Sequence, residues 1–284
     1  MEYVTLNNGI KMPKLGYGVY QTPPEDTKRC VLDAIEVGYR SIDTAQAYHN
    51  EEGVGAALAE SGLPREEFFL TTKVWITNAG YEKAKASIAE SMRKLRTDYL
   101  DLLLIHQPFG DYYGTYRAME ELYKEGKLRA IGVDNFTPDK LADFMFWNKV
   151  KPAVNLVECN PFFQREDERA YMESKDIQMQ AWSPLSAGQA NLFQNETLCA
   201  IAANHKKTAA QMVLRWLTQR GIVPIVKSAN PQRMKENLSI FDFALTEAEM
   251  RQIVALDTGH TCFVPRQTGP AVEEFLEKSL LYQL

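Results

Sequence analysis

Four side chains that can hold or transfer a proton follow three consecutive β-like segments of the sequence. Asp43 ends the first of these segments, with Tyr48 in the loop beyond it. Lys73 lies near the end of the second, and His106 directly follows the third. The carboxyl ends of neighbouring parallel strands share one face, so these groups would converge there. Each residue alone has an ordinary structural explanation, but the four together favour a catalytic site.

Their chemistry suits proton transfer to a carbonyl oxygen. A free tyrosine ionises near pH ~10, and a neighbouring ammonium stabilises the phenolate, so Lys73 would bring the pKa of Tyr48 closer to a useful range. An ammonium at the end of a buried strand needs a partner, and Asp43 is one strand away. His106 would donate a hydrogen bond to the substrate oxygen. Such a site supplies no electrons, so it requires a hydride carrier.

Eight short apolar segments alternate with stretches of helical periodicity and must position these groups. The segments are residues 15–20, 41–43, 68–74, 100–105, 129–133, 154–158, 178–182 and 223–226. Helices are predicted over residues 26–37, 84–95, 116–123 and 208–220, with another beginning at Thr137-Pro138. Before all of these, strand-like residues flank Asn7-Asn8-Gly9, which predicts a β-hairpin.

This alternation predicts an α/β protein: a (β/α)8 TIM barrel with an N-terminal β-hairpin. Because no linker or change of composition interrupts it, residues 1–284 are expected to form one barrel domain. A doubly wound open sheet is the alternative, and it often carries G-x-G-x-x-G after its first strand. Here Gly16-Tyr17-Gly18 has neither a third glycine nor a helix immediately behind it, so the barrel is preferred.

Composition excludes several classes of partner. The chain has 284 residues, with 32 basic and 37 acidic side chains and a net charge of -5, which argues against nonspecific binding to nucleic acid or anionic membrane. No apolar run approaches the roughly 18 residues of a membrane span, and the N-terminus does not resemble a signal peptide. Four widely spaced cysteines indicate free thiols, with neither a metal site nor a disulfide framework. A cytoplasmic protein is expected.

Three stretches of the sequence resemble signatures of the aldo-keto reductases: GYRSIDTAQAY at residues 38–48, TKVW at 72–75 and LIHQP at 104–108. The similarity runs along essentially the whole chain, and it is close to the bacterial and plant-like members, among them the 2,5-diketo-gluconate and methylglyoxal reductases. The resemblance implies NADPH-dependent reduction of aldehydes and ketones by a monomer. Hydride would come from the nicotinamide C4, with Tyr48 as general acid, Asp43 and Lys73 tuning it, and His106 orienting the substrate.

The same resemblance implies an NADPH/NADP+ site. Asn135 and Gln164 would bind the nicotinamide carboxamide, and Trp182 would stack on the ring. Lys227 ends the eighth strand, and Arg233 opens a helix whose N-terminal amides favour anions, which suits the 2′-phosphate of NADPH. The implied cofactor residues are Val19, Tyr20, Asp43, Asp134, Asn135, Gln164, Trp182, Ser183, Pro184, Leu185, Lys227, Ser228, Ala229, Asn230, Arg233, Glu236 and Asn237.

One residue departs from the family pattern. The family usually has Gly-x-Ser-Asn-Phe after the fifth strand, and this chain has Asp134 in place of the serine. A carboxylate there could accept a hydrogen bond from the carboxamide, and its charge would lie near a ring that becomes positive on oxidation. We hypothesise that Asp134 strengthens NADP+ binding relative to NADPH, unless a neighbouring cation or a turn contact neutralises it.

Aromatic residues predict a small apolar or planar carbonyl substrate. The expected substrate residues are Tyr20, Tyr48, Trp75, His106, Gln107 and Phe109. A C-terminal loop, residues 259–270, is expected to close over the substrate. Its Arg266 could meet a carboxylate or phosphate, although a solvated loop charge is the preferred interpretation.

Two other functions stay open on sequence alone. The chain could be a sensor or regulatory subunit that binds NADPH without turnover, although the intact catalytic set argues against this. It could also be a Schiff-base lyase that uses Lys73. A lyase would leave the apparent 2′-phosphate residues at 227–237 unexplained.

Overall fold

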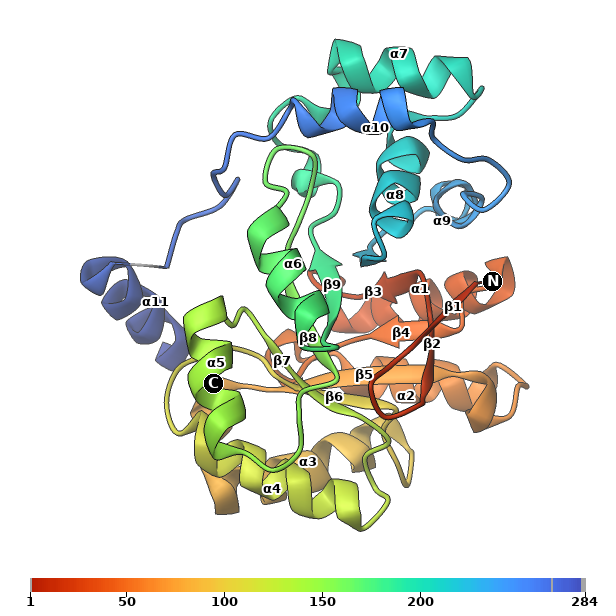
Figure 1. Cartoon of the computed structure of the whole chain (residues 1–284). Coiled ribbons are helices and arrows are strands. Elements are labelled where there is room, and N and C mark those ends of the chain that lie inside the picture. Colours follow the sequence, from red (N-terminus) through yellow and green to blue (C-terminus); the bar gives the residue numbers. More distant parts are fainter. Residues whose placement is uncertain (1, 267, 282–284) are drawn as a thin grey trace.

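The computed structural model describes residues 2–266 and 268–281, and its centre is a closed barrel of parallel strands in the order β10-β3-β4-β5-β6-β7-β8-β9 (Figure 1). The bounds are β3 Gly16–Gly18, β4 Ser41–Asp43, β5 Phe69–Val74, β6 Leu102–Ile105, β7 Ile131–Asp134, β8 Val154–Glu158, β9 Gln178–Trp182 and β10 Val223–Val226. The predicted barrel is confirmed. Because every neighbouring pair in it is parallel, all eight carboxyl ends open on one face.

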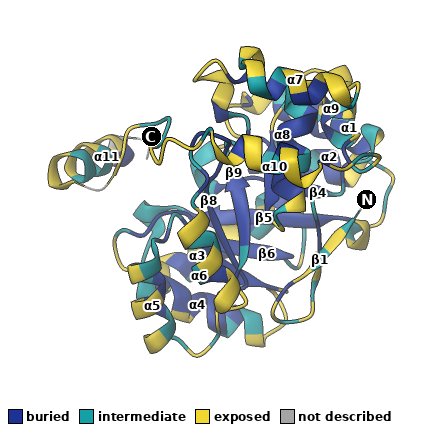
Figure 2. Ribbon diagram, turned by 45° about the horizontal axis from the view of Figure 1, so that its top comes forward, coloured by how far each residue is buried: buried dark blue, intermediate teal, exposed yellow. Residues whose placement is uncertain are grey.

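Helices surround the strands and bury one face each. Their bounds are α1 Pro24–Val37, α2 Glu51–Glu60, α3 Tyr81–Leu95, α4 Tyr112–Lys124, α5 Pro138–Trp147, α6 Glu166–Ser174, α7 Glu196–Asn204, α8 Ala209–Gln219, α9 Pro231–Leu238, α10 Glu247–Val254 and α11 Gly269–Leu281. Short 3-10 turns are Gln46–Tyr48, Arg65–Glu67, Ile76–Asn78, Ser186–Gly188 and Leu192–Gln194. Figure 2 shows buried strands inside and exposed residues on the outer faces of the helices.

Local sequence signals set several helix ends. Gly38 ends α1 with φ 119°, in the left-handed region that glycine adopts without strain. Thr208 begins α8 through a capping box with Gln211. Pro138 opens α5 as predicted, but the side chain of the preceding Thr137 makes no cap hydrogen bond.

The N-terminal hairpin is also confirmed. Strands β1 (Tyr3–Thr5) and β2 (Lys11–Pro13) pair antiparallel. Leu6 and Met12 of this hairpin join a buried cluster with residues at the starts of barrel strands, including Phe69 and Leu102. The hairpin therefore closes the amino end of the barrel.

Close backbone packing requires glycine at two positions. A Cβ at Gly132, on β7, would lie 2.5 Å from the carbonyl oxygen of Val154 on the next strand. A Cβ at Gly55, on α2, would lie 2.3 Å from the carbonyl oxygen of Lys94 on α3. Neither backbone atom can move away as a flexible side chain would, so both positions exclude a larger residue.

The strand bounds differ in detail from the sequence prediction. Four strands match, whereas β3 is shorter than residues 15–20. β6 begins at Leu102, two residues later than predicted, although Leu100 forms an isolated bridge with Leu128. The Asp101 carboxylate accepts from the Leu70 amide and binds Arg65 and Arg129. β7 ends at Asp134, one residue later than predicted, which places Asp134 inside the strand.

The C-terminal part covers the open end of the barrel from one side. Both views show α11 at the periphery of the molecule (Figures 1 and 2), and it packs on the Ile76–Asn78 turn that follows β5. Gln267, in the predicted C-terminal loop, lies outside the described residues. The four cysteines are free, as predicted. No helix in the described ranges is long and apolar enough to cross a bilayer.

Candidate active site

The catalytic candidates converge on a buried ammonium. Nζ of Lys73, which is 0% exposed, donates to Oδ1 of Asp43 at 2.5 Å and to the carbonyl oxygen of Thr44 at 2.9 Å. The same nitrogen donates to the hydroxyl of Tyr48 at 3.4 Å. Lys73 and Asp43 lie on neighbouring strands, β5 and β4, whose register brings their side chains together.

The loop after β4 is held by side chains that the sequence analysis did not select. Asn50 accepts from the Thr44 hydroxyl at 2.8 Å and donates to the Val19 carbonyl at 3.0 Å. Gln46 accepts from the backbone amide of Trp75 at 2.9 Å. These hydrogen bonds tie the loop that carries Tyr48 to the ends of β3 and β5. Only their spatial arrangement distinguishes these residues from ordinary loop polar groups.

Burial is the largest influence on the pKa of Tyr48, the predicted proton donor. It raises the pKa of Tyr48 above the usual value, and the nearby Lys73 cation opposes this shift only partly. The net direction is opposite to the sequence expectation, because the enclosure of the phenol could not be judged from spacing. Burial lowers the pKa of Lys73, but the pKa is raised overall, chiefly by the charge and hydrogen bond of Asp43. Lys73 is therefore charged, and Tyr48 keeps its proton.

His106 lies against Tyr48 as a neutral imidazole. The two ring centroids are 5.5 Å apart in an edge-on arrangement, and the Trp75 ring is 5.0 Å from the imidazole. Burial, assisted by the charges of Lys73 and Arg266, lowers the pKa of His106 well below its usual value. A neutral imidazole has one N–H to donate. Its Nδ1 is buried and has no partner among the described residues.

A second chain of hydrogen bonds crosses from β7 to β9. Nε1 of Trp182 donates to Oδ1 of Asn135 at 2.9 Å, and Nδ2 of Asn135 donates to Oδ1 of Asp134 at 2.7 Å. Oδ2 of Asp134 lies 3.9 Å from Nε2 of His106. Burial raises the pKa of Asp134 well above its usual value, although Lys73 and Arg266 act against this shift. The predicted cofactor residues Asp134, Asn135 and Trp182 thus form one group beside the proton donor.

Comparison with known proteins agrees with this geometry. The sequence matches the Aldo/keto reductase family over residues 9–258. The chain belongs to the aldo/keto reductase family. It is 46% identical to the glyoxal reductase of Bacillus subtilis over 275 residues, which cover 96% of this chain and 97% of the relative.

Solved structures of aldo-keto reductases match the whole barrel. One from a Medee basin deep-sea metagenome library has a TM-score of 0.91 and 42% identity, covering 94% of this chain and 99% of its own. A Bombyx mori aldo-keto reductase in complex with NADP has a TM-score of 0.88 and 33% identity, covering 93% of this chain and 95% of its own. The protein is an NADP-dependent oxidoreductase.

The residues predicted to bind the 2′-phosphate lie at the end of β10 and in α9. Lys227 and Arg233 are exposed. No ion pair engages either side chain within residues 2–266 and 268–281. Asn230 caps α9 by accepting from the Arg233 amide at 3.1 Å. The side chains of Lys227 and Arg233, together with the N-terminal amides of α9, are suited to bind a phosphate group.

The segment after β9 also fits a cofactor. Ser183 has φ 49°, and its buried hydroxyl has no partner in the described part of the chain. A buried hydroxyl without a partner is costly unless a ligand or water satisfies it. The adjacent Pro184 and Leu185 are buried and half-buried, respectively. This segment is therefore available for the pyrophosphate, as the sequence prediction has it.

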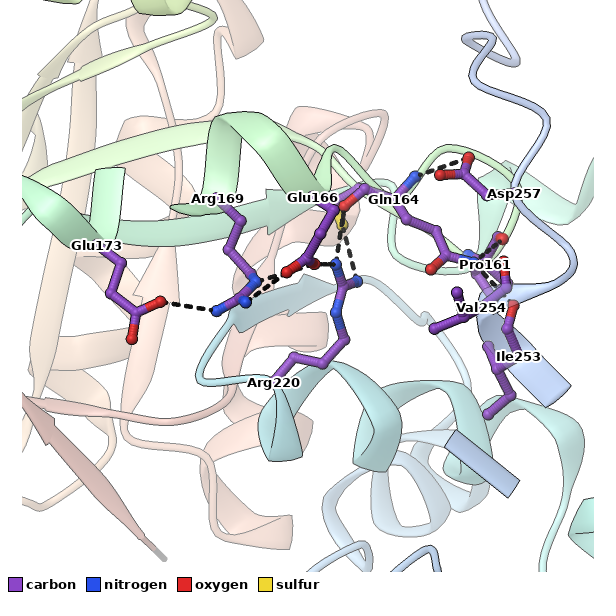
Figure 3. A network of polar contacts seen from close by, with 10 residues as sticks. Pro161, Gln164, Glu166, Arg169, Glu173, Arg220, Ile253, Val254 and Asp257 are labelled. Atoms are coloured by element: carbon purple, nitrogen blue, oxygen red, sulfur yellow. Dashed lines mark hydrogen bonds and ion pairs between the residues drawn. The ribbon is translucent and has the colours of Figure 1, made fainter. Parts of the chain in front are cut away.

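Gln164 does not join the group around the nicotinamide residues. Its amide nitrogen donates to the carbonyl oxygens of Pro161 and Ile253, both at 2.8 Å (Figure 3). It therefore ties the loop after β8 to the end of α10. Beside it, Arg220 donates to the Gln164 carbonyl at 3.0 Å and pairs with Glu166 at 2.7 Å. Because the amide is already engaged, we leave Gln164 out of the proposed cofactor site.

The substrate-side aromatics gather as predicted, with one addition. The Tyr20 ring lies 5.0 Å from that of Tyr48. Phe275, on α11, packs 6.1 Å from Trp75 and 5.7 Å from Phe109. Gln107 is buried. No sequence feature singled out Phe275, because its contacts join distant parts of the chain.

A buried carboxylate holds the C-terminal segment in place. Glu158, at the end of β8, accepts from the Cys262 amide at 3.1 Å and from the Thr261 hydroxyl. The next residue, Phe263, packs against the Trp182 ring with centroids 5.3 Å apart. This contact places the segment over the predicted nicotinamide-stacking residue.

A separate groove at the opposite end of the barrel carries none of these groups. It has a volume of about 770 Å³ and lies between the hairpin and the start of β9. Three of its charged residues, Arg169, Arg220 and Glu173, belong to the ion-pair network of Figure 3. The groove therefore does not bear on the catalytic chemistry.

Proposed function

We propose that this aldo-keto reductase reduces aldehydes and ketones to alcohols with NADPH, with Tyr48 as the general acid. The observation that supports the proposal is the buried relay in which Tyr48 contacts Lys73 and Lys73 contacts Asp43. A protonated phenol beside a fixed cation can give its proton to a carbonyl oxygen, and the cation stabilises the phenolate left behind.

The chain's own residues supply orientation and charge. His106, held neutral, donates a hydrogen bond that orients the carbonyl oxygen toward Tyr48. Asp43 and the Thr44 carbonyl hold the Lys73 ammonium in place. Bound NADPH supplies the hydride from its nicotinamide C4. After reduction, Tyr48 regains its proton from solvent.

The cofactor would be held by residues from four strand ends and one helix, α9. Asp134, Asn135 and Trp182 would hold the nicotinamide, and Ser183, Pro184 and Leu185 the pyrophosphate. The adenosine 2′-phosphate would be bound by the segment with Lys227, Ser228, Ala229, Asn230, Arg233, Glu236 and Asn237. Val19 and Tyr20 would border the nicotinamide on the β3 side. The unpaired Lys227 and Arg233 support NADPH over NADH.

The Schiff-base alternative fits the geometry poorly. A lysine must lose its proton to attack a carbonyl. Here the pKa of Lys73 is raised overall, chiefly by Asp43, so the amine stays protonated. Its hydrogen bonds also engage the nitrogen.

The first experiment follows the loss of NADPH absorbance with a panel of aldehydes, 2-oxoaldehydes and diketo acids. Tyr48→Phe removes only the hydroxyl, so we expect kcat to fall about a hundredfold or more, in line with the loss of a general acid. NADPH affinity should stay unchanged. Tight NADPH binding without turnover of any carbonyl would instead favour the sensor function.

A further inference from the structure

Arg266 is positioned by an aromatic stack on the substrate side of the barrel. Its guanidinium carbon lies 3.9 Å from the centroid of the Phe275 ring. Phe275 in turn packs on Trp75, and Trp75 packs on His106. A guanidinium stacked on a ring keeps its N–H edge available for an anion. Arg266 is therefore linked by packing to the run of rings that leads to His106.

The charge of Arg266 reaches the catalytic groups, yet no acid pairs with it. Within residues 2–266 and 268–281, no hydrogen bond or ion pair engages its guanidinium. It nevertheless helps to lower the pKa values of His106 and Asp134. Arg266 is an exposed residue, but the atoms around it shield its guanidinium in part, and this desolvation lowers its pKa. A partly desolvated guanidinium without a hydrogen-bonding partner gains when an anionic ligand supplies one.

A second cation, Lys140, lies over the neighbouring ring of Phe109. Nζ of Lys140 lies 5.7 Å from the centroid of the Phe109 ring and donates to the Pro108 carbonyl at 3.4 Å. Phe109 and Phe275 contact each other, with centroids 5.7 Å apart. The two adjoining rings therefore each carry a cation, although the chain as a whole has a net charge of -5. Local positive charge of this kind attracts anionic substrates.

Three acidic groups near this rim are already engaged or buried. Asp143, one turn after Lys140, accepts from Trp147 at 3.2 Å and from Tyr113. On α11, Glu274 pairs with Lys278 at 2.5 Å. Asp134 is buried, and burial favours its protonated form. None of these carboxylates forms an ion pair with Arg266 in the described structure.

We propose that Arg266 is a specificity-determining residue that binds the carboxylate of an anionic aldehyde substrate. The proposal rests on the proposed carbonyl reduction and names its substrate class. His106 and Trp75 lie between Tyr48 and Phe275, so the carboxylate must be several bonds from the carbonyl. An aromatic aldehyde with the acid on the far side of its ring fits this separation.

The test compares two aldehydes of nearly equal shape, para-carboxybenzaldehyde and para-formylbenzamide. In Arg266→Met, we expect KM for the carboxylate to rise about tenfold, since a charge-assisted hydrogen bond contributes ~1.5–3 kcal/mol and partial exposure reduces this. The kcat values and the KM for the amide should change less than about twofold. Arg266→Lys should recover part of the preference. Added salt should weaken the preference in the wild type and in Arg266→Lys, and it should have no such effect in Arg266→Met.

Arg251→Met is the matched control, because this exposed arginine lies on α10 and pairs only with Glu247 at 3.6 Å. Equal effects of Arg266→Met on both aldehydes, or no effect on either, would overturn the proposal. Calorimetry with the alcohol products para-(hydroxymethyl)benzoate and para-(hydroxymethyl)benzamide tests Arg266 without turnover. A wild type that binds both alcohols equally contradicts the Arg266 proposal. A wild type that prefers the benzoate but reduces no carbonyl contradicts only the proposed function.

Discussion

At the scale of single residues, Lys73 is a fully buried cation whose charge is compensated by neighbouring oxygen atoms. Its ammonium is enclosed, and Asp43, Thr44 and Tyr48 surround it with oxygen atoms. Removing one member of such a pair leaves an uncompensated buried charge, which destabilises a protein strongly. The relay is catalytic in the proposed mechanism, and it also contributes to stability. Substitutions in it should therefore be tested for their effect on folding as well as on rate.

His106 should give the protein a pH-dependent stability. In the folded state its pKa lies well below the usual 6.5, so it stays neutral, whereas in the unfolded chain it takes up a proton below that value. The unfolded state then binds more protons, and stability is lost as pH falls through about 6.5. We expect His106→Gln to reduce the fall in unfolding free energy between pH ~7.5 and ~5.5 by about 1.4 kcal/mol. Denaturant titrations at both pH values measure this, and the exposed His260→Gln should leave the fall unchanged.

Asp134 should make the preference for oxidised cofactor depend on pH. Burial favours its neutral form, so it acts as an anion only after it loses this proton at higher pH. We expect the ratio of the NADPH to the NADP+ dissociation constants to rise with pH in the wild type and to stay flat in Asp134→Ser. Fluorescence titrations with NADPH and NADP+ at several pH values measure both dissociation constants. Equal effects of the substitution on the two constants at every pH would rule out an electrostatic role.

At the scale of elements, capping decides how well individual helices begin. Thr208 accepts from the Gln211 amide at 3.2 Å, whereas Thr137 occupies the same position on α5 without a cap hydrogen bond. We expect Thr208→Ala to cost about 1 kcal/mol and to lower Tm by roughly 2–4 °C. Thr137→Ala, the matched control, should have a smaller effect. Calorimetry of the two variants measures the difference, and equal losses would show that the capping box does not contribute.

The elements also show what sequence can and cannot predict. The apolar runs and the Asn-Gly turn identified every barrel strand and the hairpin, because local patterning is enough to define them. The convergence of Asp43, Tyr48, Lys73 and His106 followed from strand ends alone. The contacts of Phe275 and Glu158 could not be predicted, since each joins segments about a hundred residues or more apart.

Gln164 shows a further limit of sequence reasoning. From the sequence, a glutamine after a strand end could form hydrogen bonds either with a cofactor or with the backbone. Only the position of α10 shows that the Gln164 amide donates to a backbone carbonyl. The direction of the shift in the Tyr48 pKa could not be predicted for a related reason. Enclosure of a phenol depends on everything that packs around it, and spacing along the chain does not contain this information.

At the scale of the whole molecule, we propose that the chain folds as one domain. Buried side chains from α1 to α10 join a single cluster that runs around the barrel. Far-ultraviolet circular dichroism and tryptophan fluorescence should therefore report one coincident unfolding transition. The tryptophans sample different depths, since Trp216 is fully buried and Trp147 is mostly exposed. An earlier fluorescence transition would indicate a separately unfolding unit.

Closure of the barrel also bears on how the protein behaves when concentrated. A sheet edge offers unpaired N–H and C=O groups to other chains, and a closed barrel has no such edge. In the described structure, only the hairpin β1–β2 is an open sheet; each of its strands is three residues long, and the second carries Lys11 and Pro13. A short edge with a lysine and a proline is a poor template for strand addition. Self-association at high concentration should therefore begin at exposed aromatic side chains such as Phe146 and Trp147, and it should leave the β-sheet content unchanged.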